Sequence, residues 1–216
     1  MKKEKIEILY EDKYIIVVNK KTGLLTISTN KEVEKTLYHQ VREYIKGKNK
    51  NNKVFIVHRL DKDTSGIVLF AKNEEIKNYL QNNWNNVKRE YLAVVNGNIK
   101  KERGTIRSYL KETKTFLVYS TNDKNGKLAI TNYEKIKSNQ DYSLLKIIIE
   151  TGRKNQIRVH LSDLGYPIVG DKKYSNIKDN VHRLYLHANV LEFYHPILKK
   201  AIRIESNMPK EFKTLI

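Results

Sequence analysis

The chain has 216 residues, and its 42 Lys and Arg outnumber its 24 Asp and Glu, which gives a formal net charge of +18. The absence of cysteine excludes a disulfide scaffold, thiolate zinc sites and a cysteine nucleophile. No apolar run approaches the ~20 residues that a membrane helix needs, and the segment after Met1–Lys5 has no signal-peptide core. We therefore expect a cytoplasmic protein without a membrane partner. Its positive charge favours an anionic partner, nucleic acid above all.

Short apolar runs separated by turn residues begin near the start of the chain. Ile6–Tyr10 and Tyr14–Asn19 predict two strands. Apolar residues at every fourth position predict a helix from about Glu34 to Lys46. The polar run Lys46–Lys53 then predicts a solvated loop, which is the best candidate for an internal boundary.

The rest of the chain reads mostly as further strands. The predicted strands are Val54–Val57, Ile67–Ala71, Tyr91–Val95, Thr105–Leu110, Phe116–Ser120, Ala129–Ile136, Tyr142–Glu150, Ala188–Phe193 and Ala201–Glu205. Asn73 is placed to cap a helix that runs to about Trp84. A third helix, from about Asn155 to Leu164, ends at Gly165. This pattern predicts an α+β fold, a mixed and largely antiparallel sheet flanked by a few helices and loops, as a single domain over residues 1–216.

The polar segment His58–Ser65 lies between two predicted strands and is closed by Gly66. Loops at strand ends are where a rigid sheet presents side chains to a ligand. The simplest interpretation is a structural loop in which Asp61 and Asp63 accept hydrogen bonds from backbone amides and Arg59 pairs with one of them.

Sharper interpretations of this segment compete. His58, Asp61 and Ser65 have the composition of a hydrolase triad, but such triads assemble from distant segments, and no Gly-x-Ser-x-Gly elbow is present. A kinase catalytic loop would need a Gly-rich nucleotide loop and an Asp-Phe-Gly motif, which the sequence lacks. A metal at Asp61 and Asp63 would need ligands that no other carboxylate or His cluster supplies. Asp61 as a lone nucleophile or base needs only a neighbouring cation and a shaped pocket.

The sequence of His58–Gly66 (His-Arg-Leu-Asp-Lys-Asp-Thr-Ser-Gly) resembles the His-Arg-Leu-Asp-x-x-Thr-Ser-Gly signature of the RluA-like family of RNA pseudouridine synthases. Further matching segments follow in the expected order: Ile8–Lys20, Lys88–Gly97, Thr151–His160, Gly165–Asp171 and Leu184–Ala188. The resemblance spans about Ile6 to Glu205. Lys21 stands where the family usually has proline, which changes loop stiffness more than chemistry. Asn155 stands where it usually has histidine, which argues against an acid–base duty there.

The resemblance implies that uridine in RNA is isomerised to pseudouridine with no metal and no organic cofactor. It places the essential catalytic role on Asp61, which would add covalently to the sugar or base, or remove a ribose proton. It implies that the Arg158 guanidinium orients the Asp61 carboxylate and favours its ionised form. Judged on its residues alone, Arg158 could equally make a surface phosphate contact or a helix salt bridge.

Tyr91 matches the family tyrosine that stacks on the target base and lies close enough to assist proton transfer. A base is modified only after it leaves its stack, and an aromatic face compensates part of that cost. The alternative is an ordinary core tyrosine in a strand, because the chain has 14 Tyr.

Four cationic residues are implied as RNA contacts. Arg59 would fill the gap left by the flipped nucleotide, although it could instead pair with Asp63. Arg153 and Lys154 follow a predicted strand and precede a helix, where backbone amides and cations together favour phosphate. Lys88 opens the segment that carries the family tyrosine.

The implied partner is a stem-loop of rRNA or tRNA, and we expect a monomer. Because the first strand begins by Ile6, we expect no accessory RNA-binding domain ahead of it. The choice of target would then depend on loops such as Lys46–Lys53, Lys111–Asn125 and Lys172–Asn180. Two other functions remain open: an RNA-binding protein without turnover, and a nucleoside hydrolase or RNA glycosylase that uses the same carboxylate.

Overall fold

The computed structural model describes residues 6–28, 35–178 and 180–216, which form two compact units. Unit 1 runs to Val87 and includes Ala188–Ser206, and unit 2 comprises Lys88–His187 and Asn207–Ile216. The loop at Lys46–Lys53 lies inside unit 1, so the predicted internal boundary there is wrong. That loop is only a polar connection between a helix and a strand, and polarity alone does not separate two cores.

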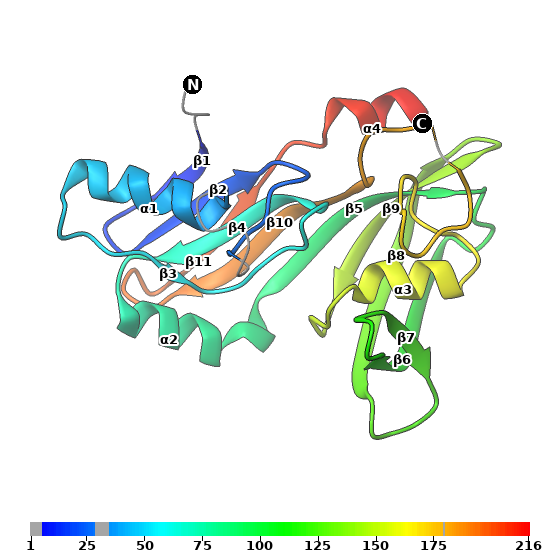
Figure 1. The fold of residues 1–216 in the computed structure, drawn as a ribbon, viewed down its shortest axis with the longest axis horizontal. Helices are drawn as coiled ribbons and strands as arrows, with labels where there is room; N and C mark the ends of the chain where they lie inside the picture. Colours follow the sequence, from blue (N-terminus) through cyan, green and yellow to red (C-terminus); the bar gives the residue numbers. More distant parts are fainter. Residues whose placement is uncertain (1–5, 29–34, 179) are drawn as a thin grey trace. The chain divides into compact units, whose positions relative to one another are not determined.

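Unit 1 is built on an antiparallel sheet (Figure 1). Its elements are β1 (Glu7–Glu11), β2 (Ile15–Lys20), α1 (Leu37–Lys48), β3 (Phe55–Ile56), β4 (Ser65–Ala71), α2 (Glu74–Asn82), the 3-10 turn η1 (Trp84–Asn86), most of β10 (Leu186–His195), and β11 (Lys200–Glu205). The strand order is β1-β2-β4-β10-β11, and β3 also pairs with β4. The pairs β1–β2, β2–β4, β3–β4 and β10–β11 are antiparallel.

Helices cover both faces of the centre of this sheet. Every residue of β4 is buried, as expected for a strand enclosed on two sides. Ile76 and Leu80 of α2 share a buried cluster with Leu69, whereas the ring of Tyr38 on α1 lies 6.4 Å from that of Phe70. Neighbouring residues of a strand point to opposite faces, so α1 and α2 pack on opposite sides of β4, as Figure 1 shows.

Unit 2 holds the other strands. Its elements are β5 (Lys88–Asn96), β6 (Arg103–Glu112), β7 (Val118–Thr121), β8 (Lys127–Ser138), β9 (Tyr142–Ile149), α3 (Gln156–Asp163) and α4 (Lys210–Leu215). The order is β5-β9-β8-β6-β7, with antiparallel pairing throughout this series.

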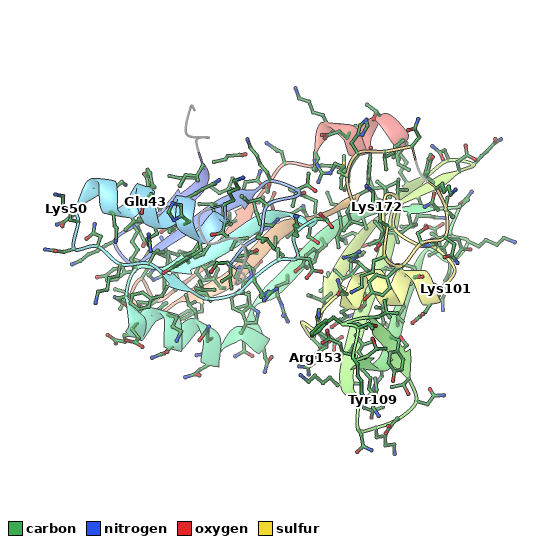
Figure 2. All side chains as sticks on the ribbon, viewed as in Figure 1. Glu43, Lys50, Lys101, Tyr109, Arg153 and Lys172 are labelled. Carbon is green, nitrogen blue, oxygen red and sulfur yellow. The ribbon has the colours of Figure 1, made fainter. Side chains whose placement is uncertain are left out.

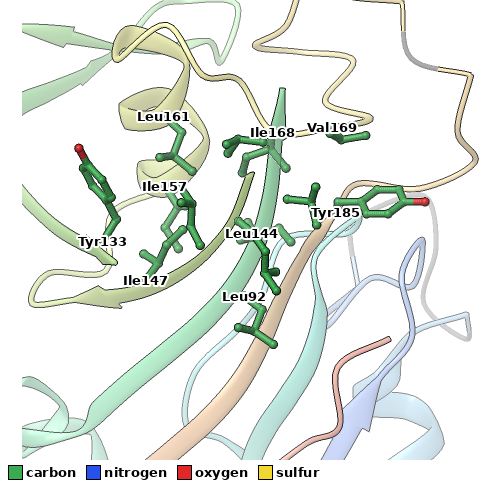
Figure 3. Close-up of a cluster of buried hydrophobic side chains, with 14 of the residues drawn as sticks. Leu92, Tyr133, Leu144, Ile147, Ile157, Leu161, Ile168, Val169 and Tyr185 are labelled. Carbon is green, nitrogen blue, oxygen red and sulfur yellow. The ribbon is translucent and has the colours of Figure 1, made fainter. Parts of the chain in front are cut away.

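Helix α3 is enclosed by apolar side chains from several strands of unit 2. Ile157 and Leu161 point from α3 toward Ile147 of β9 (Figure 3). Val159 belongs to a second cluster with Val118 of β7. The helix is therefore buried on more than one side, and its residues from Gln156 to Leu161 are all buried.

The predicted fold class is confirmed, and most elements lie within a few residues of their expected positions. Asn73 caps α2, since its Oδ1 accepts from the N–H of Ile76 at 2.8 Å. Gly165 follows α3 with φ +85°, as a residue just after a helix end requires. The predicted first helix begins at Leu37; its expected start at Glu34 lies outside the described residues.

One helix was not predicted, and one predicted strand begins too early. Helix α4 was not expected, because six residues are too few to show a helical period. Phe116, the first residue of a predicted strand, lies instead in the turn before β7, with φ +63°.

Gly66 should be irreplaceable for steric reasons. Its φ is +115°, and a Cβ built there would lie 2.1 Å from the carbonyl oxygen of Ala188 on β10. We expect Gly66→Ala to lower the free energy of unfolding by more than about 3 kcal/mol, from backbone strain and overlap together. Gly23→Ala is the matched control, since Gly23 has φ +77° with nothing within 4 Å of the added Cβ. Urea unfolding of both variants measures the difference, and equal losses would contradict the proposed overlap.

Candidate active site

The signature segment Val57–Gly66 connects β3 to β4 in unit 1. Leu60 is buried, Asp61 is half-buried and Arg59 is exposed. Ser65 already belongs to β4 and is buried. The segment is therefore anchored by its apolar residue and by its strand end, with Arg59 and Asp61 accessible between them.

Lys20 fixes the backbone beside Asp61. It ends β2 and is only 1% exposed, although lysine is almost never fully buried without partners. Its ammonium group donates to the carbonyl oxygens of Lys21 at 3.0 Å, Leu24 at 2.6 Å and Lys62 at 2.8 Å. These bonds match the three N–H donors of an ammonium group. One buried charge thus joins the turn after β2 to the residue that follows Asp61.

Two threonines add to this connection. Thr26 Oγ1 donates to the carbonyl of Leu60 at 2.8 Å and accepts from its N–H at 3.2 Å. Thr22 Oγ1 donates to the carbonyl of Asp63 at 2.7 Å. The backbone is therefore held on both sides of Asp61 by the segment that follows β2. A loop restrained in this way presents its carboxylate in one geometry.

His58 is an anchor of the same loop. The N–H of Leu69 donates to His58 Nε2 at 3.0 Å, and the imidazole stacks on Trp84 with ring centroids 4.5 Å apart. A ring nitrogen that accepts carries no proton, so this imidazole is neutral, and Nε2 is already bound to the backbone. This contact argues against His58 as the base of a hydrolase triad.

In unit 2, Arg158 on α3 forms a buried ion pair with Asp171. Its Nε donates to Oδ2 at 2.7 Å and its Nη2 donates to Oδ1 at 2.6 Å. Asp171 is 2% exposed, and Oδ1 also accepts from the N–H groups of Lys173 at 2.9 Å and Tyr174 at 3.0 Å. Arg158 is 7% exposed, which argues against the surface phosphate contact considered above. The pair uses two of the five N–H donors of a guanidinium.

Tyr174 supports Arg158 from a second direction. The Arg158 guanidinium carbon lies 5.1 Å from the centroid of the Tyr174 ring. The Tyr174 hydroxyl accepts from the N–H of Val118 at 3.2 Å, and its carbonyl accepts from Ser162 Oγ at 2.6 Å. A carboxylate in its plane and an aromatic ring on its face hold the guanidinium in one orientation. No role for Asp171 or Tyr174 was predicted from the sequence; the only available signal was that Asp171 ends a segment matching the family.

Strand β5 carries Tyr91 and Lys88. Tyr91 is half-buried and packs against the core of unit 2. Part of its side chain therefore belongs to that core, as the alternative interpretation predicted. Lys88 is exposed and pairs with Glu90 at 2.9 Å. The neighbouring Arg89 is buried and donates to the carbonyl of Glu150 at 2.9 Å; burial lowers the pKa of its guanidinium. Arg89 is thus a structural cation of unit 2.

The loop before α3 carries Arg153 and Lys154, both exposed. Arg153 Nε donates to the carbonyl of Leu128 at 2.9 Å, and Lys154 is paired with Glu112. Asn155 is buried and has φ +55°. Asparagine tolerates this left-handed conformation better than most residues, which accounts for a non-glycine residue there.

Two buried histidines in unit 2 are neutral structural residues. His160 Nδ1 lies 2.8 Å from Thr131 Oγ1, and its Nε2 lies 3.0 Å from Ser108 Oγ. Burial lowers the pKa of His160 to about 4. Burial, assisted by the nearby charge of Arg183, also lowers the pKa of His187 to about 4. Near neutral pH both imidazoles are therefore uncharged.

The described part of the chain contains no group of three or more His, Asp or Glu side chains arranged to hold a metal ion. Over the same residues, no helix combines the length and apolar character needed to cross a membrane.

The structure groups the candidate residues by unit. Arg59 and Asp61 share one loop of unit 1, whereas Lys88 and Tyr91 share β5 of unit 2. The loop before α3 carries Arg153 and Lys154, and α3 itself carries Arg158. The expected pairing of Arg158 with Asp61 stays a prediction.

Comparison with known sequences gives the family. The family described as RNA pseudouridylate synthase matches residues 14–163, which include the Asp61 loop, β5 and α3. The chain belongs to the RNA pseudouridine synthases. Enzymes of this family are isomerases that act on RNA.

Individual relatives of this synthase cover nearly the whole chain. The tRNA pseudouridine synthase C of Haemophilus influenzae is 33% identical over 98% of this chain and 96% of the relative. The ribosomal large subunit pseudouridine synthase C of Rickettsia bellii is 36% identical over 95% of this chain and 69% of the relative. The solved structure of human RNA pseudouridylate synthase domain containing 1 is 25% identical, with a TM-score of 0.79 over 94% of this chain and 84% of that one.

The Lys20 contacts predict a large effect from removing one charge in this synthase. Lys20→Met should leave the carbonyl oxygens of Lys21, Leu24 and Lys62 without this donor and lower the free energy of unfolding by at least about 3 kcal/mol. Lys62→Met is the matched control, because the exposed Lys62 contributes only its backbone carbonyl to this network. Chemical unfolding measures both variants. A Lys20→Met protein as stable as Lys62→Met would contradict the anchoring role.

Proposed function

We propose that this enzyme converts specific uridines of rRNA or tRNA to pseudouridine, with Asp61 as the essential catalytic residue. The observation that carries the proposal is the restraint of the Asp61 loop by Lys20, Thr22 and Thr26, which holds the backbone on both sides of one accessible carboxylate. A loop with only a structural role would not require an accessible acid at its centre.

The chemistry needs little more than this carboxylate. Isomerisation breaks the bond between the ribose and N1 of uracil, turns the base, joins its C5 to the ribose and releases the C5 proton. Asp61 would either add covalently to the sugar or base, or remove a ribose proton. Both routes use the ionised carboxylate, and both end with the C5 proton leaving to solvent.

We assign further roles within this proposal to Arg158 and Tyr91. The Arg158 guanidinium would stabilise the charge of the catalytic carboxylate, and Asp171 and Tyr174 keep it oriented for that purpose. Tyr91 would stack on the flipped uracil with the part of its ring that the core leaves uncovered.

Four exposed cations are proposed as RNA contacts: Arg59, Lys88, Arg153 and Lys154. The family match runs across both units, which supports treating residues 1–216 as one catalytic domain. Relatives named for tRNA and for ribosomal RNA are about equally similar to the chain, so both RNA classes stay within the proposal. Mapping pseudouridine in total RNA with and without the enzyme identifies the target.

The role of Asp61 is tested by tritium release from RNA labelled at C5 of uridine. Isomerisation releases this tritium to water, whereas RNA binding and base excision do not. Asp61→Asn should reduce release at least about 10³-fold, because the carboxylate is essential and no neighbour replaces it. RNA affinity should stay close to that of the wild type.

Asp63→Asn is the matched control for this measurement, because Asp63 is exposed in the same loop and its backbone carbonyl still accepts from Thr22. Asp63→Asn should retain most of its activity. Turnover by Asp61→Asn at the wild-type rate would refute the assignment.

A comparison with a second tyrosine variant shows whether Tyr91 acts in catalysis or only packs in the core. Tyr91→Ala should lower kcat about 10²-fold or more, with a small change in RNA affinity. Tyr142→Ala is the comparison, because Tyr142 packs, partly buried, against the same cluster. It should lower stability while leaving kcat of the folded enzyme nearly unchanged. If both variants lose only stability, Tyr91 is an ordinary core residue.

A further inference from the structure

Phe116 is placed where neither burial nor backbone preference explains a phenylalanine. It lies in the turn Thr113–Leu117 between β6 and β7, and it is 69% exposed. Its φ is +63°, a conformation that is strained for an aromatic residue and costs about 1–3 kcal/mol. A residue that is exposed and strained in this way is a candidate for binding.

The turn holds this ring in a defined position. The N–H of Phe116 donates to the carbonyl of Thr113 at 3.0 Å, and the N–H of Thr113 donates to the carbonyl of Leu117 at 2.8 Å. Lys173 Nζ donates to the carbonyl of Phe116 at 2.8 Å. The aromatic face is therefore displayed by a hydrogen-bonded turn that is tied to a second segment of unit 2.

A lysine ammonium group lies against this aromatic ring, and a second one contacts the backbone of the same residue. Lys154 Nζ is 5.2 Å from the centroid of the Phe116 ring, within the range of a cation–π contact. Lys173 contributes its ammonium group at the Phe116 carbonyl. An aromatic face beside ammonium groups matches a nucleotide, in which a flat base adjoins an anionic phosphate.

A basic pocket adjoins the turn on the same unit. It has a volume of about 360 Å³, within the usual range for sites that hold small ligands. Its charged lining residues are Lys111, Lys127, Arg153 and Lys154, with Glu112 as the one acid. In Figure 2, Arg153 and Tyr109 of β6 mark this part of unit 2. Because cations outnumber acids in this lining, the pocket favours an anionic ligand over a neutral or cationic one.

The acids nearby do not block such a ligand. Lys154 is paired with Glu112, and Lys111 is paired with Asp123. All four side chains are at least one third exposed, and ion pairs of this kind contribute little and rearrange readily. A phosphate can therefore replace Glu112 and Asp123 as the partner of these lysines at a small cost in free energy.

We propose that the turn Thr113–Leu117 and the basic pocket bind an unpaired nucleotide of the RNA, in addition to the target uridine, with its base on Phe116 and its phosphate at the pocket. This inference rests on the proposed function for its partner, because it takes RNA as the substrate. The nucleotide must be unpaired, since a base inside a duplex has no free face to stack on an aromatic ring.

Phe116→Asn tests the proposal without endangering the fold. Asparagine suits a left-handed backbone, so this variant should be at least as stable as the wild type in thermal unfolding. The probe is a fluorescently labelled single-stranded RNA of about twelve nucleotides, a length that a single-strand binding surface can engage. Phe116→Asn should weaken its binding roughly 5- to 150-fold, as expected for the loss of one stacked base. Phe116→Trp, which keeps an aromatic face, should bind about as well as the wild type.

Cation and duplex controls complete the design. Lys154→Gln with Lys173→Gln should weaken binding and reduce its salt dependence, whereas Lys100→Gln with Lys101→Gln, two exposed lysines outside the pocket, should have a smaller effect. The same RNA annealed to its complement should respond little to Phe116→Asn. Equal binding of single-stranded RNA by Phe116→Asn and the wild type would overturn the proposal. So would a change from dimer to monomer in Phe116→Asn on size exclusion, because the ring would then be a protein contact.

Tritium release by the same proteins separates this inference from the proposed function. If the wild type isomerises uridine and Phe116→Asn binds RNA normally, the nucleotide site is wrong and the proposed function stands. If the wild type releases no tritium from any RNA but loses affinity on Phe116→Asn, the nucleotide site stands and the proposed function fails.

Discussion

The buried ammonium group of Lys20 is the constraint on which the Asp61 loop depends. A lysine charge removed from water is tolerated only where hydrogen-bond acceptors replace the lost hydration, and here three backbone carbonyls do so. These three acceptors are peptide dipoles, and they supply hydrogen bonds that the ammonium group would otherwise make to water. One of the carbonyls belongs to Lys62, and the local geometry of the Asp61 loop is thereby tied to the end of β2.

In unit 2, the buried guanidinium of Arg158 is held by a carboxylate. Arg158 is paired with Asp171 through two parallel hydrogen bonds, and two backbone N–H groups complete the carboxylate. A guanidinium has more donors than one carboxylate can use, so it can be held firmly and still bind a second anion. An ammonium group has only three donors, and that of Lys20 makes three contacts to backbone carbonyls. This difference explains why a lysine fixes the loop while an arginine is the better candidate for contact with the reacting groups.

The excess of positive charge is distributed among different tasks. Lys20 and Arg89 are buried, and their charges serve the fold. Exposed cations such as Arg59, Arg153 and Lys154 are available to a polyanion. Beside Phe116 the exposed Lys154 adjoins an aromatic face, and this combination underlies the proposed site for an unpaired nucleotide. Net charge alone therefore overstates how much of the surface is devoted to RNA.

The sequence by itself determined the fold class, most element positions and the family, because strand and helix periods, caps and a nine-residue signature are all local features of the chain. It also singled out Asp61, Tyr91 and Arg158, each from a contiguous motif. Only the tertiary structure decided that Lys20 donates to Lys62, that His58 accepts from Leu69 and that Asp171 pairs with Arg158. Each of these contacts joins residues separated along the chain, and hydrogen-bond partners at such distances are set by how the elements pack. The same holds for Phe116, which local pattern assigned to a strand and which the pairing of β6 with β7 placed at the tip of a turn.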